Sequence, residues 1–476
     1  MAPVCQTAGR STCPSSKWYG GETTETGDER TDRSRAVGVG MTGVADAYGG
    51  EMRDLAERLV AVETTAGDEA PAQRWLRERL GDLGFETHTW TADPERLAGH
   101  PSFPSAARLS ADPDAGGLGV ADRSSVAGVV EFGEPDAGRT LVLNGHVDVV
   151  PAGEAGWSGD PFEPRWEGDR LVGRGAVDMK SQLAACVFAA RRLADRVKAG
   201  ELELDGRLVV ESVAGEEDGG VGAAAAALAN PYPFERDAAV VAEPTDGRVV
   251  TATAGCLMAR IEIEGRPAHA ARKWQGESVL PHLDRVRAAL DRLERKRAER
   301  VTHPLYDRFE TPWPVVVGRV DAGTWASNVP GKLTADVRVG VAPGETIDAV
   351  ERELRDALAA AAAEDPWLAE HPPTVERLGV QFESAEIDPD EPVVGALQGA
   401  LRTAGRSESA IAPAGETYGS DARHDIAAGL PTVVYGPGRI EAAHFPDESV
   451  HWPDVEAAAA VLTDTARRFL AGDGAE

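Results

Sequence analysis

The sequence predicts an α/β protein in which a mostly parallel sheet, covered by helices on both faces, is interrupted by a smaller inserted α/β sandwich. Three observations support this prediction. Short apolar strands alternate with amphipathic helices between residues 126 and 242, which is typical of a parallel sheet. After Thr251 the strands instead alternate apolar and polar residues, and the first pattern returns near Val380. The 476 residues also exceed the length over which one hydrophobic core keeps growing, so two domains are expected.

In the larger part, helices are predicted where apolar residues recur every three or four positions, and buried strands where short apolar runs are rich in valine. After the inserted part, the same patterns predict a helix, a strand and a final helix. In chain order we predict helices at 51–63, 71–83, 179–194 and 221–228, strands at 126–132, 140–143, 207–213 and 238–242, and finally a helix at 393–403, a strand at 432–435 and a helix at 455–470.

The inserted part is predicted from strands with one polar face and from two amphipathic helices that could cover the other face. The strands lie at 257–264 and at the two ends of 315–341, and the helices at 277–297 and 346–363. We therefore expect a disordered tail at 1–45, with Met41 as an alternative start, a first catalytic segment at 46–253, a lid and dimerisation domain at 254–379, and a second catalytic segment at 380–476. The tail is predicted because it is rich in Ser, Thr, Gly and charge.

The composition excludes several classes of function. A formal net charge of -30, from 79 acidic and 49 basic residues, argues against a nucleic-acid partner. No apolar run approaches the roughly 20 residues that a membrane-spanning helix needs, so no membrane partner is expected. Four widely spaced cysteines form no disulfide framework, which fits a reducing cytoplasm. The acidic, lysine-poor composition resembles that of halophilic proteins, and an ordinary acidic cytoplasmic protein is the alternative.

Five short motifs place an acid or a histidine where a strand of the larger part ends. The carboxyl ends of parallel strands are where ligands gather in open α/β sheets. Each motif alone also has a structural explanation, such as a surface pair, a solvated helix start or a turn. The motifs are GHVD at 145–148, GRGAVDMK at 173–180, EEDGG at 216–220, AEPT at 242–245 and AHFPDE at 443–448.

Together, the order and glycine context of these motifs resemble the M20 family of metallopeptidases and amidohydrolases, over about residues 50 to 470. The phrase GTWASNVP at 323–330 is most similar to the branch of acetylornithine deacetylase and succinyl-diaminopimelate desuccinylase. The resemblance implies hydrolysis of a linear amide in a small N-acyl amino acid, through a hydroxide that bridges two metal ions. A carboxypeptidase or dipeptidase on the same scaffold is the alternative. A binding protein that has lost turnover is less favoured, because every expected ligand is present.

The resemblance also implies a ligand set. It assigns His146, Asp178 and Glu243 to one ion, and Asp178, Glu217 and His444 to the second, so that Asp178 bridges the pair. Imidazole and carboxylate donors suit Zn²⁺, and Co²⁺ or Mn²⁺ are also possible. Family members have a cis peptide bond after the bridging aspartate.

Two acids next to these ligands receive roles from the same resemblance. Glu216 is implied to be the general base, and Asp148 to be the acid that orients the His146 ring. Residues two apart on a strand share a face, which suits Asp148 for this task. The simpler interpretation of Glu216 is a mere neighbour of Glu217.

The inserted part contributes further implied residues. His269, in GRPAH at 265–269, is implied to reach across a homodimer interface and stabilise the oxyanion, and a structural histidine is the alternative. Asn328 and Arg338 are implied to hold the substrate, since arginine can grip a carboxylate with two hydrogen bonds. Gly419 and Ser420 match a loop that contacts the substrate carboxylate, although a plain turn explains them equally well.

Overall fold

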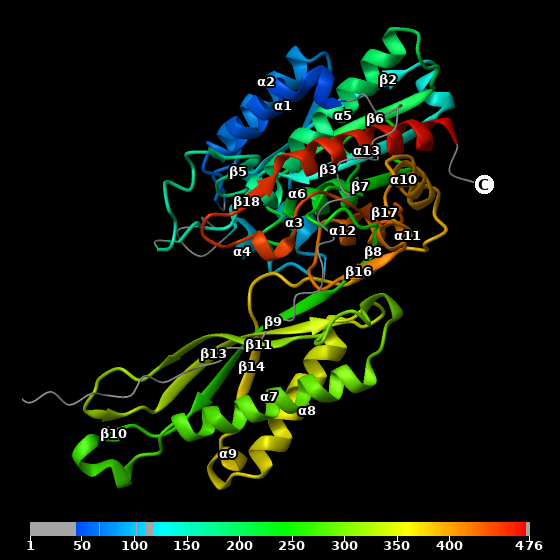
Figure 1. The fold of residues 1–476 in the computed structure, drawn as a ribbon. Helices are drawn as coiled ribbons and strands as arrows, with labels where there is room; N and C mark the ends of the chain where they lie inside the picture. Colours follow the sequence, from blue (N-terminus) through cyan, green and yellow to red (C-terminus); the bar gives the residue numbers. More distant parts are fainter. Residues whose placement is uncertain (1–43, 66, 101, 111–117, 154, 473–476) are drawn as a thin grey trace, which may run out of the picture. The chain divides into compact units, whose positions relative to one another are not determined.

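The computed structural model describes residues 44–65, 67–100, 102–110, 118–153 and 155–472 (Figure 1). The predicted tail at 1–45 lies almost wholly outside these residues, except that the first helix, α1 (Val44–Val60), already includes its last two positions. None of the described helices combines the length and the apolar character needed to cross a membrane.

The larger sheet runs in the order β1-β2-β6-β3-β7-β17-β8-β15, and β16 pairs with β8. Its central strands β6, β3, β7 and β17 are mutually parallel, whereas the pairs β1–β2 and β2–β6 at one side and β17–β8 and β8–β15 at the other are antiparallel. The predicted fold class is therefore confirmed, with antiparallel edges that the sequence did not predict. The bounds are β1 (Glu86–Thr91), β2 (Ser124–Phe132), β3 (Arg139–His146), β6 (Gly206–Val213), β7 (Ala238–Val241), β8 (Val250–Thr253), β15 (Ala385–Glu386), β16 (Ala414–Glu416) and β17 (Thr432–Val434).

Both faces of this sheet are buried, as the apolar strands predict. Leu141 and Leu143 on β3 belong to the main core, whereas Val142 between them packs in a separate cluster with Tyr232 and Leu430. The main core is covered by α1, α2 (Ala70–Asp82), α5 (Ser181–Lys198), α10 (Pro392–Thr403) and α13 (Trp452–Ala471). On the opposite side lie α6 (Val221–Leu228) and α12 (Ala422–Ala427).

A four-stranded antiparallel sheet, in the order β11-β13-β9-β14, forms the inserted part. Alternate residues of β9, including Leu257, Ile261 and Ile263, are buried against two helices, while the residues between them are partly exposed. Figure 1 shows the two helices, α7 and α8, along this sheet. The bounds are β9 (Gly255–Glu264), α7 (Leu280–Arg300), β11 (Val315–Ala322), β13 (Lys332–Val341), α8 (Ile347–Ala363) and β14 (Thr374–Arg377).

The predicted sandwich with one open face is thus present, and the change from the larger to the smaller sheet falls between β8 and β9. The domain boundaries at 253 and 379 stay a prediction. Two smaller sheets were not predicted: β10 (Ala268–His269) pairs with β12 (Asn328–Val329), and β4 (Arg165–Glu167), β5 (Arg170–Val172) and β18 (Ser449–His451) form a three-stranded sheet.

Candidate metal centre

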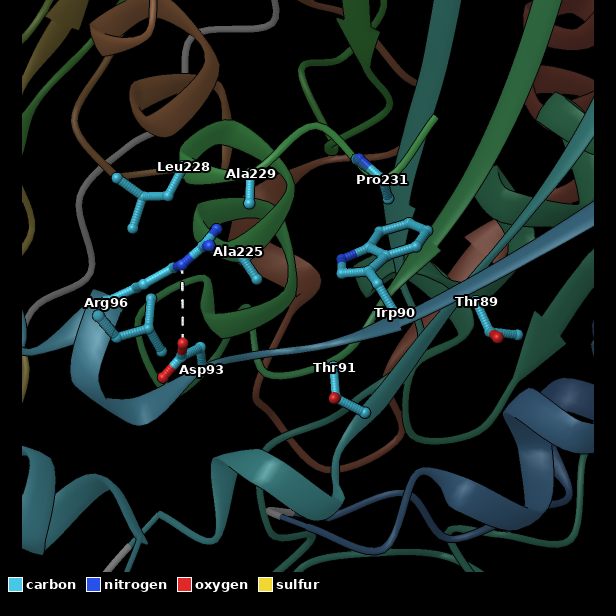
Figure 2. A pocket seen from close by; sticks show the side chains of 10 residues that line it. Thr89, Trp90, Thr91, Asp93, Arg96, Ala225, Leu228, Ala229 and Pro231 are labelled. Atoms are coloured by element: carbon cyan, nitrogen blue, oxygen red, sulfur yellow. Dashed lines mark ion pairs between the residues drawn. The ribbon is translucent and has the colours of Figure 1, made fainter. Parts of the chain in front are cut away.

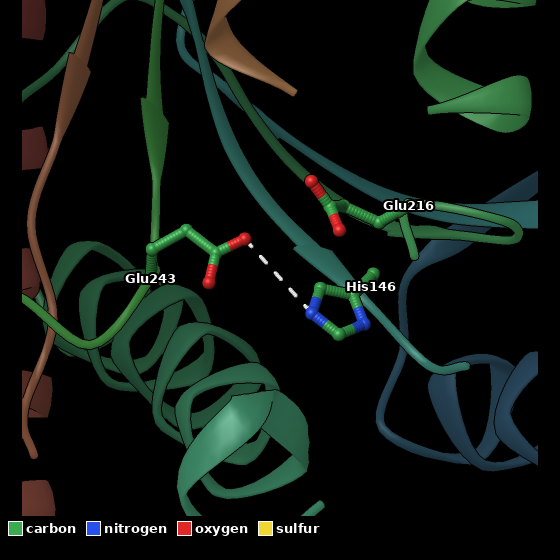
Figure 3. A group of neighbouring side chains, drawn as sticks. All are labelled: His146, Glu216 and Glu243. Atoms are coloured by element: carbon green, nitrogen blue, oxygen red, sulfur yellow. Dashed lines mark ion pairs between the residues drawn. The ribbon is translucent and has the colours of Figure 1, made fainter. Parts of the chain in front are cut away.

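Three adjacent parallel strands bring their acids and histidine to one edge of the larger sheet. His146 is the last residue of β3, Glu216 and Glu217 follow β6, and Glu243 follows β7. Because β6, β3 and β7 are neighbours and parallel, their carboxyl ends meet at this edge. One ligand atom from each of His146, Glu216 and Glu243 lies within 4.8 Å of the others (Figure 3).

Asp178 lies between two histidines from distant parts of the chain. Its Oδ1 is 3.0 Å from His146 Nε2, and its Oδ2 is 3.3 Å from His444 Nε2. His444 Nε2 is also 3.0 Å from Glu217 Oε1. His146 Nε2 is 3.9 Å from Glu243 Oε1. One carboxylate oxygen therefore faces each histidine, as a bridging ligand requires. The Asp178–Met179 peptide bond is cis, as the resemblance implies.

The chemistry of these donors fits a pair of divalent ions. Imidazole nitrogens and carboxylate oxygens, without a thiolate, suit zinc and similar metals. Four of the five expected ligands are largely buried, and buried carboxylates need compensating positive charge. The assignment of each residue to one ion remains a proposal.

Without metal, burial and mutual repulsion dominate the electrostatics of this cluster. Burial, together with the charges of neighbouring acids, raises the pKa values of Glu216 and Glu243 well above the usual range. Burial acts in the same sense on Asp178, but hydrogen bonds to the two histidines outweigh it and lower the pKa of Asp178. Hydrogen bonds to Asp178 and Glu217 raise the pKa of His444 to about 10.

We expect the metal-free protein to lose stability as the pH rises from about 5 to about 9. The raised pKa values of Glu216 and Glu243 mean that the folded state keeps protons which the unfolded state releases above its carboxyl pKa of 4.5, so rising pH favours unfolding. For His444, the stabilisation is complete below the unfolded pKa of 6.5 and is lost as the pH rises through about 10. The two glutamates and His444 therefore all make the folded state less stable as the pH rises.

Thermal melting of chelated and metal-loaded protein over this pH range checks the expectation. The metal-loaded form is the control, because bound cations replace the protons. The gap in melting temperature between the two forms should widen with pH, and a gap that narrows would contradict the electrostatics of the site.

The His146 ring is held by the backbone of Asp148. His146 Nδ1 lies 2.9 Å from the Asp148 carbonyl oxygen, whereas the Asp148 carboxylate is 3.8 Å away. That carboxylate instead accepts hydrogen bonds from the backbone N–H groups of Gly215, Glu216 and Glu217, at 2.8, 3.2 and 3.0 Å. The carboxylate thus stabilises the turn after β6, and the expected role of Asp148 in orienting the His146 ring stays a prediction.

Glu448 supports the centre and was not predicted. Its side chain is almost fully buried, and its Oε1 accepts hydrogen bonds from the N–H groups of Val177 and Asp178 at 3.0 and 3.2 Å. An ion pair with Arg174 balances its charge. Glu448 thereby positions the backbone of the bridging residue. The sequence feature that could have pointed to Glu448 is its place four residues after His444, in the same motif.

The expected substrate-binding residues fall into two groups. Arg338 Nη2 donates to the Thr417 carbonyl oxygen at 3.2 Å, which places this arginine beside the loop of Gly419 and Ser420. The buried Ser420 hydroxyl has no hydrogen-bond partner within the described part of the chain. His269 and Asn328 lie elsewhere: they pair with each other across β10 and β12, and both are exposed.

Asn328 also lines a hollow of about 400 Å³ on the inserted part. His269 belongs to neither group of candidate metal ligands among the described residues.

A hollow of about 200 Å³ between β1 and α6 is a separate feature (Figure 2). Trp90 and Pro231 form part of its wall, and Arg96 pairs with Asp93 at 3.6 Å at its rim. No candidate ligand of the metal centre is among the described residues that line it. We assign it no part in the chemistry.

Comparison with known proteins decides the family. The sequence model of peptidase family M20/M25/M40 matches residues 142–468, which contain all five expected ligands. The chain belongs to this family. This M20 protein is a dinuclear metal hydrolase that acts on carbon–nitrogen bonds, so the expectations of a metal-dependent enzyme and of two metal ions are confirmed at this level.

Curated relatives of this M20 protein include deacylases. It is 28% identical over 423 residues to the N-formyl-4-amino-5-aminomethyl-2-methylpyrimidine deformylase of Bacillus subtilis (strain 168), covering 84% of this chain and 90% of the relative. It is 26% identical over 342 residues to the acetylornithine deacetylase of Vibrio atlanticus (strain LGP32), covering 72% and 84%.

Solved structures share its fold. A metallo-carboxypeptidase of the M20 family from Sulfolobus solfataricus superposes with a TM-score of 0.65 at 15% identity, covering 88% of this chain and 99% of the other. A tripeptidase from Staphylococcus aureus gives a TM-score of 0.62 at 17% identity, covering 88% and 98%. At such identities the likeness concerns the fold alone.

Proposed function

We propose that this M20 protein removes a short acyl group from an N-acylated amino acid or a related N-acylated amine. The observation that carries the proposal is the position of Asp178 between His146 and His444, with Glu216 on the same side of the sheet. Two of the curated relatives are named for removing formyl or acetyl groups from nitrogen. These names favour deacylation over cleavage of a peptide between two residues, which is the runner-up activity.

In this proposal the metal ligands are His146, Asp178, Glu217, Glu243 and His444. When bound, two divalent ions would activate a water molecule and polarise the scissile carbonyl. Glu216 accepts a proton from the attacking water on a carboxylate oxygen and passes it to the leaving nitrogen. Burial raises the pKa of Glu216 in the metal-free chain, which is the direction that a group returning a proton as an acid requires.

Arg338 is proposed to bind the carboxylate of the substrate. It is half-buried, and its Nη2 donates to the Thr417 carbonyl oxygen at 3.2 Å. Guanidinium groups bind carboxylates in a planar, two-bonded geometry. The neighbouring Gly419 and Ser420 would contribute a backbone N–H and a hydroxyl to the same carboxylate.

We further propose that the enzyme is a homodimer formed through the inserted part. His269 is exposed and belongs to neither ligand group of the described chain, so in this proposal it serves the centre of the partner. The cytoplasmic location and the adaptation to high salt remain predictions from the composition.

Turnover of a matched substrate panel tests the proposed reaction. We expect N-acetylornithine, N-succinyl-diaminopimelate or N-formyl-4-amino-5-aminomethyl-2-methylpyrimidine to be hydrolysed with a kcat/KM at least about tenfold above that of dipeptides, because a pocket built for one group discriminates by that factor or more. Chelation should abolish all turnover, and Zn²⁺, Co²⁺ or Mn²⁺ should restore it. Faster hydrolysis of a dipeptide would replace the proposed activity with the runner-up.

A further inference from the structure

The turn that carries Glu216 and Glu217 is closed by its own backbone. The N–H of Gly219 donates to the Glu216 carbonyl at 2.8 Å, and the N–H of Gly220 donates to the Gly215 carbonyl at 2.8 Å. The Asp148 carboxylate fixes the start of this turn through three N–H groups. The glycines at its end have no side chains to pack, so a hydrogen bond to a backbone carbonyl there adds support to the turn.

His424 on α12 provides a contact at that end. Its Nε2 lies 3.1 Å from the Gly219 carbonyl oxygen, and its side chain is 2% exposed. A carbonyl oxygen only accepts hydrogen bonds, so Nε2 carries the proton and donates. Burial, assisted by the charge of Arg423, lowers the pKa of His424 well below the usual range, so the imidazole is neutral and has this single N–H.

The approach of α12 to the turn is close. Gly220 adopts a φ of 75°, and a Cβ at this position would collide with the side chains of Asp421 and His424. Glycine is therefore required both by the left-handed backbone and by the space. The contact leaves little room for the turn to move closer to α12.

Aromatic rings also hold the imidazole in place. Its ring stacks on Phe103, with centroids 5.9 Å apart and an interplanar angle of 19°, and it meets the His100 ring edge-on at 5.5 Å. The ring is thus packed on a face by Phe103 and hydrogen-bonded at an edge through Nε2. The packing of the ring and its hydrogen bond can therefore be removed separately by mutation.

We propose that His424 is a positioning residue whose hydrogen bond to the Gly219 carbonyl holds Glu216 and Glu217 in place for proton transfer and metal binding. The inference rests on the roles proposed for these two glutamates. His424 acts through the backbone: its N–H fixes the Gly219 peptide, whose own N–H is bonded to the Glu216 carbonyl. Supports of this kind commonly contribute about 10- to 100-fold to metal affinity or activity.

Three variants separate the hydrogen bond from the packing. His424→Phe keeps an aromatic ring and removes the donor, His424→Gln keeps a donor of similar reach and removes the ring, and Phe103→Leu weakens the stacking without changing His424. We expect His424→Phe to lower kcat roughly 10- to 100-fold, with KM within about twofold, and to weaken Zn²⁺ binding in a titration of the metal-free protein by a similar factor. His424→Gln and Phe103→Leu should remain within about threefold of the wild type in both measurements.

The proposal is overturned if His424→Phe behaves as the wild type, or if His424→Gln or Phe103→Leu falls as far as His424→Phe. Should His424→Phe fail to fold, hydrogen exchange of the amides at 215–220 in His424→Gln decides: wild-type protection supports the bond, and lost protection contradicts it. A failure of the proposed general base can be told apart from a failure of this proposal. A fully active Glu216→Gln enzyme would refute the role of Glu216, and the Zn²⁺ affinity of the His424 variants would still test whether His424 positions the turn.

Discussion

The substitution Glu216→Gln is expected to lower kcat by roughly 10²- to 10⁴-fold, the range that general acid–base catalysis contributes. Glutamine keeps the size of the side chain and its hydrogen-bonding capacity but cannot accept and return a proton. The turn itself should survive, because it is held by backbone bonds and by Asp148 and not by the Glu216 carboxylate. Steady-state kinetics with the best substrate of the panel gives the measurement, and metal analysis should still find two ions per chain.

The exposed ion-pair residue Glu201 offers a matched control. Glu201→Gln makes the same change of charge far from the strand ends that form the centre, and its kcat should equal that of the wild type. A Glu216→Gln enzyme with an unaltered rate would refute the role of this residue as general base, whereas loss of metal together with activity would identify it as a ligand, in agreement with its proximity to His146 and Glu243.

Replacement of His269 by alanine is expected to lower kcat roughly 10²- to 10³-fold, the usual effect of removing one oxyanion donor. The structure places this residue at an exposed position of the inserted part, paired with Asn328. A large effect would show that turnover needs this residue, and the subunit on which it acts is then decided separately.

Mixed dimers test this directly. In a dimer of one His269→Ala chain and one Glu216→Gln chain, the first chain has an intact base and receives the intact histidine of the second. Random mixing of two inactive variants should restore about a quarter of the wild-type activity, since half of the dimers are mixed and each has one complete site. Variants that stay inactive after mixing, while size exclusion shows a dimer, would place the function of His269 within its own chain.

Much of the fold follows from local patterns. The helix predicted at 221–228 matches α6, and the buried runs at 140–143 and 207–213 lie within β3 and β6. The edge strand β1 was not predicted, because it is half-exposed and mixes histidine, threonine and tryptophan without clear alternation. The strands β8, β15 and β16 have only two to four residues each, so their pairing, and not a local pattern, defines them.

In the metal centre, too, residues in local motifs could be predicted, whereas contacts between distant residues could not. Its expected ligands could be found because each follows a strand or lies in a short motif with glycine or proline. The contacts of His424 and Glu448 could not be predicted, because their partners lie 205 and 271 residues away and only folding brings them together. The hydrogen bonds of the Asp148 carboxylate could not be predicted for a related reason, since its partners are backbone N–H groups of a turn that the sequence does not reveal.

The most direct test of the account is a crystal structure of the metal-loaded enzyme with anomalous scattering at the zinc edge. We predict two peaks roughly 3.5 to 4 Å apart, one beside His146 and Glu243, one beside Glu217 and His444, with Asp178 touching both. A single ion, or a pair of ions held by other residues, would contradict the central claim.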